Sequence, residues 1–181
     1  TLDLGSVPVV LRIPFDIPPS AAAGPRGFYI TAGEGPEILE HDPLGRLSRI
    51  SRIAEPVRRV TREDFDRYVD VRTARIGDPS AAAAERQVYA QMPLPEYMPA
   101  FQTLRVDDEG WLWAEAYSYD VAQPAVWMVF DAEGRAHGTV ELPPALEVYH
   151  IGADYILGRW RDELDVEYVR RHRLRRTQWP D

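Results

Sequence analysis

The feature that most restricts the fold of this chain is a strand–turn–strand motif that occurs twice and, in a less similar form, a third time. Residues 28–53 and 111–142 each contain strand-forming runs joined by a turn of the form Asp-x-x-Gly-Arg, at residues 42–46 and 131–135. Residues 155–173 repeat the strands with a different turn. Repeats of about 40–50 residues that are made of short strands are typical of β-propeller blades. The repeat predicts an architecture, and it does not indicate an activity.

The repeats therefore predict an all-β fold, a partial β-propeller of about three four-stranded antiparallel blades. Within one domain, blade-like units are expected at about residues 8–60, 100–143 and 145–175. The last unit shows three clear strands and lacks a fourth. Residues 107–110 form a further turn, because Asp accepts hydrogen bonds from the backbone two residues on and Gly tolerates positive φ.

Residues 61–92 interrupt the strand pattern and predict an inserted helical hairpin. Thr61 is suited to cap the first helix, with Asp64 at its third position as a shortened capping box. Ser80 precedes a second helical run rich in alanine.

Two segments near the start of the chain leave alternatives open. The small residues 21–24 fit an innermost blade strand close to a central channel, and they fit a flexible loop equally well. Residues 7–15 are strand-forming but interrupted by prolines, which indicates an edge strand or the end of a unit. Whether this segment closes a ring of blades is open.

The composition excludes several classes of function. The net charge of −8 argues against a nucleic-acid binder, which needs a basic face for phosphates. All 21 basic residues are arginine, so no lysine is present to act as a nucleophile or form a Schiff base. Cysteine is absent, which excludes disulfides and thiolate metal sites. No apolar run reaches the roughly 18–20 residues of a membrane span.

Six residues are candidates for a binding site, since several lie at predicted strand ends: Asp107, Asp108, Trp111, Trp113, His150 and Asp154. Trp111 and Trp113 share a strand face, so they either stack on a ligand such as a sugar or fill the gap between blades. In propellers the second role is commoner. His150 stands among apolar neighbours, where a buried imidazole is commoner than a ligand.

The sequence contains no close histidine pair and no Gly-x-Ser-x-Gly motif, so we predict no catalytic residue, metal site or cofactor. The favoured function is a non-catalytic binding or scaffold module. The alternative is a propeller hydrolase, lactonase-like or carbohydrate-active, with a metal held by carboxylates at the channel mouth. A third hypothesis makes the insert at residues 61–92 the docking element.

Several sequence segments resemble those of a bacterial group of six-bladed, TolB-like β-propellers. They lie at residues 94–100, 106–113, 129–135, 138–143 and 154–164. The inserted helices also look like that group, and the likeness covers most of the chain, more firmly after residue 90. It concerns the fold, and it implies no set of catalytic residues.

The resemblance implies six blades, whereas this chain has material for about three and looks like the C-terminal half of such a protein. A partial ring leaves apolar blade faces uncovered at both ends, so we expect a partner half or self-association. The resemblance also implies a periplasmic or secreted location.

Overall fold

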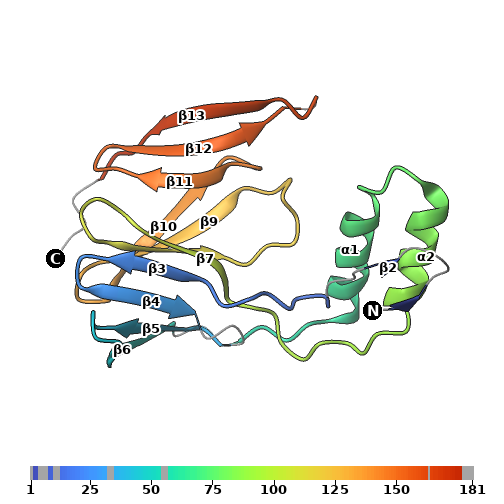
Figure 1. Cartoon of the computed structure of the whole chain (residues 1–181), viewed down its shortest axis with the longest axis horizontal. Coiled ribbons are helices and arrows are strands. Elements are labelled where there is room, and N and C mark those ends of the chain that lie inside the picture. The colour runs from blue at the N-terminus through green and yellow to red at the C-terminus, as the bar shows by residue number, and fades with distance from the viewer. Residues whose placement is uncertain are drawn as a thin grey trace.

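The computed structural model describes residues 2–3, 8–9, 13–31, 35–53, 57–162 and 164–176. Three antiparallel sheets, in which each strand pairs with the next along the chain, form a partial β-propeller (Figure 1). Blade 1 contains β3 (Ala21–Gly24), β4 (Gly27–Thr31), β5 (Glu37–His41) and β6 (Leu47–Arg52). Blade 2 contains β7 (Phe101–Val106), β8 (Leu112–Ala116), β9 (Ala125–Phe130) and β10 (Ala136–Leu142). Blade 3 contains β11 (Glu147–Ile151), β12 (Tyr155–Arg161) and β13 (Glu167–Arg173).

These sheets confirm the predicted all-β fold with a helical insertion. Blade 3 has three strands, as expected. The prediction for residues 7–15 falls in part, at residues 7 and 10–12, outside the described ones. Within them, β2 (Pro8–Val9) pairs with β1 (Leu2–Asp3) in a separate two-stranded sheet.

The first strands of the three blades lie at the centre of the array, where β3 and β11 both contact β7 (Figure 1). Residues 21–24 thus form a strand, which decides the question left open by the sequence. A Cβ atom on Gly24 would lie 3.2 Å from Cγ1 of Val106. Small residues are needed here because the inner strands approach closely.

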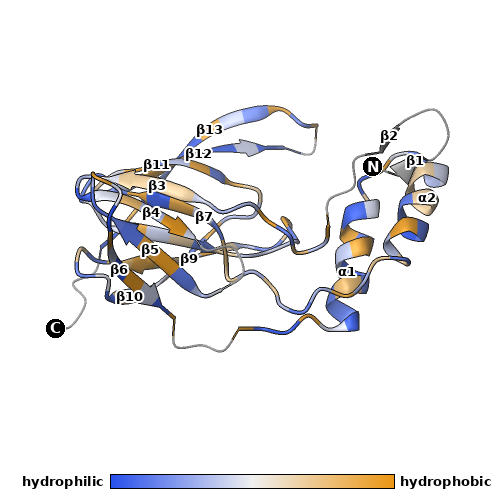
Figure 2. Ribbon diagram, turned by 60° about the horizontal axis from the view of Figure 1, so that its bottom comes forward, coloured by the Kyte–Doolittle hydropathy of each residue, from blue (hydrophilic) through white to orange (hydrophobic). Residues whose placement is uncertain are grey.

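Each pair of neighbouring blades shares a hydrophobic core. Between blades 1 and 2, Tyr29 and Ile38 pack with Leu104 and Phe130. Between blades 2 and 3 a second buried cluster includes Trp113. Hydrophobic and hydrophilic positions alternate along the strands, as expected for sheets with two different faces (Figure 2). This alternation decides which side chains reach the space between blades.

The insert is a pair of antiparallel helices, α1 (Arg62–Thr73) and α2 (Pro79–Tyr89). Thr61 and Asp64 form the predicted capping box. The second helix begins earlier than expected, because Pro79 and Ser80 are its first residues. Asp78 is the N-cap, because its carboxylate accepts the Ser80 N–H and Pro79 fits the first helical position, where no donor is needed.

The helices pack against the blade array through an aromatic cluster. Phe65 of α1 and Tyr89 of α2 are buried in it. Tyr68 meets Tyr119 with ring centroids 6.1 Å apart, and Phe15 contacts Tyr117 and Tyr119 edge-on. Tyr117 and Tyr119 belong to the loop between β8 and β9. The insert therefore supports that loop, which matters for the site described below.

Four hairpins share one turn geometry. In each, an aspartate carboxylate accepts the backbone N–H groups two and four residues on. The four aspartates are Asp42, Asp107, Asp131 and Asp162. The residue three positions later has positive φ: it is Gly in the first three turns and Asp165, at 61°, in the fourth. The third repeat therefore contains the same turn, between β12 and β13, with Asp165 in place of Gly.

Asp131 is expected to make the fold sensitive to acid. Burial raises the pKa of its carboxyl, but hydrogen bonds from His137 and Arg135 outweigh burial and hold that pKa well below its usual range. A depressed pKa stabilises the fold above the unfolded value of about 3.9, and this stabilisation is lost as pH falls.

We therefore expect Asp131→Asn to lower the free energy of unfolding by about 2 kcal/mol at pH 6, with the difference shrinking towards pH 2. Urea unfolding at several pH values measures it. Asp42→Asn is the control, since no ion pair of Asp42 occurs in the described part of the chain. A difference that stays constant from pH 6 to pH 2 would contradict the assignment.

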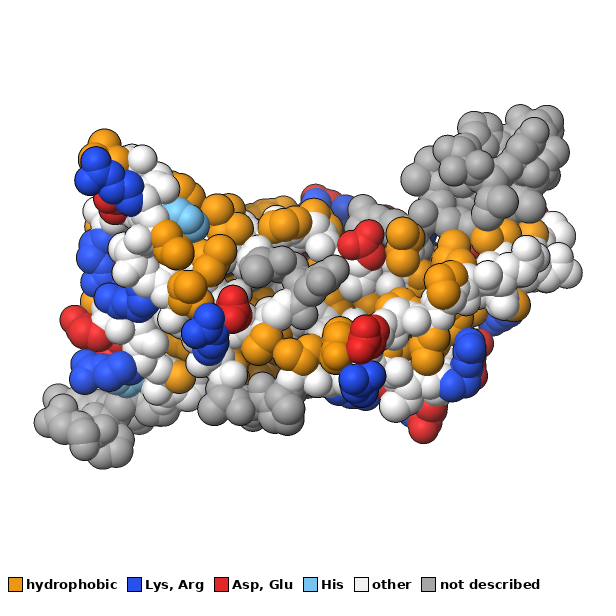
Figure 3. Space-filling view, turned by 90° about the horizontal axis from the view of Figure 1, so that it is seen from below, with side chains coloured by type: hydrophobic (Ala, Val, Ile, Leu, Met, Phe, Trp, Pro, Cys, Tyr) orange, Lys and Arg blue, Asp and Glu red, His pale blue; other side chains and the backbone are white. Residues whose placement is uncertain are grey.

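The outward faces of the two end blades differ. On blade 1 the face turned away from blade 2 is largely apolar and carries the Glu37–Arg52 ion pair at one end; its other residues are Ala21, Ala23, Phe28, Ile30, Leu39, His41, Leu47 and Ile50. Seen from below, hydrophobic side chains gather over this part of the molecule (Figure 3). The corresponding face of blade 3 instead carries ion pairs, such as those of Arg159 with Glu147 and Glu167. Apolar faces were expected at both ends, and the structure shows a predominantly apolar one at blade 1.

Candidate functional site

The predicted site residues gather at the hairpin end of blades 2 and 3. Asp107 is fully buried and accepts the indole N–H of Trp113 at 2.7 Å and a guanidinium N–H of Arg176 at 2.7 Å. It also accepts two backbone N–H groups of its own turn. The Arg176 guanidinium lies 5.5 Å from the ring centre of Trp111. All of these contacts are internal, so Asp107 and Trp113 hold the turn together and offer nothing to a ligand.

The other predicted residues lie nearby on the surface. Nε2 of His150 lies 3.2 Å from Oδ2 of Asp108, and Asp154 pairs with Arg171 at 3.4 Å. The expectation of a buried His150 is wrong, because 45% of its side chain is exposed. A β-bulge between Val148 and His150 is the cause, since the extra residue shifts the alternation and turns His150 outward.

A pocket lies at the opposite end of the same two blades. It has a volume of about 430 Å³ and opens between the β8–β9 loop and the connection from β10 to β11. The helical insert stands at this end too, and the chain runs through it from β6 to β7 (Figure 1). The volume is within the range of about 300–1,000 Å³ that is typical of small-molecule sites.

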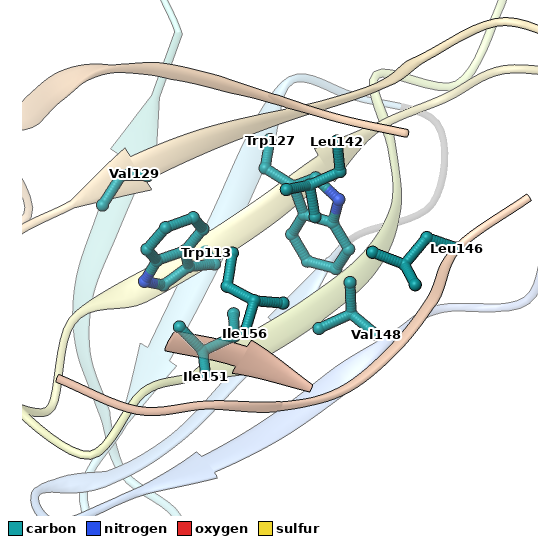
Figure 4. Close-up of a cluster of buried hydrophobic side chains, with 8 residues drawn as sticks. All are labelled: Trp113, Trp127, Val129, Leu142, Leu146, Val148, Ile151 and Ile156. Atoms are coloured by element: carbon teal, nitrogen blue, oxygen red, sulfur yellow. The ribbon is translucent and has the colours of Figure 1, made fainter. Parts of the chain in front are cut away.

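The floor of the pocket is part of the core between blades 2 and 3. Trp127, Leu146 and Val148 line it, and each is buried. In the close-up, the indole nitrogen of Trp127 lies on the side of its ring that faces Leu142 and Leu146 (Figure 4). That nitrogen is buried and has no hydrogen-bond acceptor in the described part of the chain. Buried donors are rarely left unpaired, and such a group costs about 1–3 kcal/mol.

A row of side chains across blade 2 carries the polar part of the pocket. Thr103 of β7 pairs with Glu115 of β8, which pairs with Trp127 of β9. Directly paired residues point to the same face of a sheet, so all three face blade 3. The half-buried carboxylate of Glu115 has neither an ion pair nor a hydrogen bond among the described residues. A partly desolvated charge without a partner is unfavourable.

The remaining charged groups at the pocket already have partners. Arg105 donates from Nε to the carbonyl oxygen of Val148 at 3.3 Å and from Nη1 to that of Leu104 at 3.2 Å. Glu147 pairs with Arg159. Asp120 accepts the N–H of Ala122 at 3.0 Å within the β8–β9 loop. Glu115 is therefore a charged side chain of the pocket without a partner among the described residues, and Trp127 adds a buried donor without an acceptor.

The pocket was not predicted from the sequence, although one signal was present. Glu115 follows Trp113 by two residues, so a carboxylate shares the strand face of a tryptophan that fills the space between blades. A charged residue on such a face needs an explanation. The loop residues and Leu146 carry no comparable signal, because nothing local indicates that they meet.

Comparison with models of known protein families, with curated proteins and with solved structures gave no match for this chain. Neither described helix has the length and hydrophobicity needed to cross a membrane. Among residues 13–31, 35–53, 57–162 and 164–176, no three His, Asp or Glu side chains converge as a metal site would require.

Proposed function

We propose that this chain is a non-catalytic β-propeller module that binds a small ligand in the pocket between blades 2 and 3. The observation that carries the proposal is the pair of unsatisfied polar groups, Glu115 and Trp127, beside an apolar floor in a pocket of about 430 Å³. Sites for small molecules combine a mostly apolar lining with a few placed polar groups. A bound ligand would supply the partner that the Glu115 carboxylate lacks.

A binding role agrees with how the pocket is built. Its walls are the rigid strands β7, β8 and β9, and one rim is the β8–β9 loop, which the helical insert supports through Tyr68 and Tyr119. Rigid elements around a site reduce the ordering that binding requires. In this proposal the insert positions a rim of the pocket, which gives the inserted helices a role within the site.

A pocket-filling variant tests the proposal. Thr103→Phe places an aromatic ring on the polar row, so fragments that bind to the wild type are expected to lose at least tenfold in affinity. Ligand-observed NMR with a fragment mixture provides the measurement. Thr139→Phe, at an exposed position of β10, is the matched control and should leave binding unchanged. Fragments that bind Thr103→Phe as tightly as the wild type would overturn the proposal.

The hydrolase alternative has less support. Asp107, Asp108, His150 and Asp154 are the residues to examine first for it, and it needs at least two carboxylates and a histidine to converge at one channel mouth. The carboxylate of Asp107 is buried and accepts four hydrogen bonds, and Asp154 pairs with Arg171. Of these four residues, Asp108 and His150 form an acid–histidine pair on the surface. The alternative stays a prediction that elemental analysis of the purified protein addresses.

Membership of the TolB-like group and the need for a partner half or self-association also remain proposals. The apolar outer face of blade 1 supports the second of them, since uncovered faces of this kind favour association. Leu47 and Ile50 on that face are 52% and 39% exposed. The solution mass of the chain decides between a lone monomer and an assembly.

A further inference from the structure

We infer that the ligand of the inter-blade pocket is a small organic cation, an ammonium or guanidinium group attached to an apolar part. The inference rests on the proposed function, because it names the class of ligand for the same pocket. Four ionisable side chains line the pocket: Arg105, Glu115, Asp120 and Glu147. Glu147 is paired with Arg159, which leaves two acids, Glu115 and Asp120, beside one arginine, so the pocket favours a positive charge.

Glu115 is the group that decides the charge of the ligand. Its carboxylate is half-buried on the strand face that turns towards blade 3, and no basic group of the described chain pairs with it. The basic side chain at the pocket, Arg105, instead donates to the carbonyl oxygens of Val148 and Leu104. A ligand cation would complete the ion pair that the protein itself leaves open. Such charge-assisted hydrogen bonds are roughly twice as strong as neutral ones.

The apolar part of the ligand follows from what surrounds Glu115. Trp127 is its cross-strand neighbour, and Leu146 and Val148 close the floor from blade 3. These three side chains are between 2% and 6% exposed, so they belong to a preformed core. An inorganic cation would leave this floor uncovered, and the described residues offer no cluster of carboxylates to coordinate one. A cation that carries an alkyl or aryl group would pair with Glu115 through its charge and cover the apolar floor with that group.

The test uses benzylammonium chloride as the probe and benzyl alcohol as its neutral counterpart. The indole N–H of Trp127 reports on the pocket by ¹H–¹⁵N NMR, and Trp127→Phe identifies its signal. Trp113 is an internal reference, because its indole N–H is bound to Asp107. We expect benzylammonium to shift the Trp127 signal and to bind about tenfold more tightly than benzyl alcohol.

Glu115→Gln should remove this preference, with benzylammonium weakened about tenfold and benzyl alcohol unchanged. Glu141→Gln is the matched control, since Glu141 is an exposed glutamate on β10 of the same blade. Glu115→Asp keeps the charge and should retain part of the preference, which guards against a loss caused by misfolding.

Two results would overturn the inference, and they have different consequences. If benzyl alcohol binds the wild type as tightly as benzylammonium, the cation assignment fails while the pocket remains a binding site. If neither probe moves the Trp127 signal, the cation assignment also fails, and the Thr103→Phe comparison then decides whether the binding function survives.

Discussion

Asp107→Ala is expected to lower the free energy of unfolding by about 4 kcal/mol. The substitution removes a fully buried carboxylate and leaves the indole N–H of Trp113 and two backbone N–H groups without their acceptor, while Arg176 keeps Glu109 and the carbonyl oxygen of Ala153 as partners. Each buried donor left unsatisfied costs about 1–3 kcal/mol, and three donors lose the Asp107 carboxylate. Urea unfolding followed by tryptophan fluorescence measures the loss.

The hairpin repeat offers a matched control for this experiment. Asp42 accepts the same two turn N–H groups, at 2.9 Å and 2.8 Å, but it has no indole or guanidinium partner among the described residues. Asp42→Ala should therefore cost only about 1 kcal/mol. Equal losses for Asp42→Ala and Asp107→Ala would show that the turn alone matters and that the links to Trp113 and Arg176 contribute nothing.

Gly27→Ala is expected to lower the free energy of unfolding by at least about 3 kcal/mol. Gly27 begins β4 with φ of +140°, and a Cβ atom would lie 1.9 Å from the carbonyl oxygen of His41 in β5. Neither strand can yield without breaking their hydrogen-bonded register. Conformations of this kind are nearly exclusive to glycine, and the overlap adds to the strain.

Gly77→Ala is the control for the glycine substitution. No atom lies within 4 Å of a Cβ placed on Gly77 within the described structure, and its φ is not positive. Thermal unfolding should show little change or a slight gain in stability for Gly77→Ala, because alanine restricts the unfolded chain. A midpoint for Gly27→Ala that matches the one for Gly77→Ala would mean that the close approach of β4 and β5 is absent in solution.

The role of Asp107 also bears on the proposed binding site. Asp107 and Trp113 hold the hairpin end of the space between blades 2 and 3, whereas Glu115 and Trp127 lie on the same face at the opposite end. At one end of β8 the indole N–H of Trp113 binds the carboxylate of Asp107, and at the other end the carboxylate of Glu115 has no partner among the described residues. This contrast is why we place the ligand at Glu115 and assign a stabilising role to Asp107.

Much of the fold followed from patterns that act over a few residues. The strand alternation, the Asp turns and the Thr61–Asp64 capping box are local, because each depends on backbone geometry and side chains within about four residues. The repeat length then predicted blades, since short strands joined by tight turns pair with their neighbours in sequence. The inserted helices followed from their own caps and spacing.

The sequence by itself determined the all-β repeats, the helical insert and the exclusion of lysine and cysteine chemistry. Only the tertiary structure decided that Trp113 is buried, that a bulge turns His150 outward and that Glu115 faces an open pocket. The reason is physical: the pocket is made where β7, β8, β9 and the connection to β11 meet. Contacts between segments so far apart along the chain depend on how whole blades pack, which no local pattern encodes.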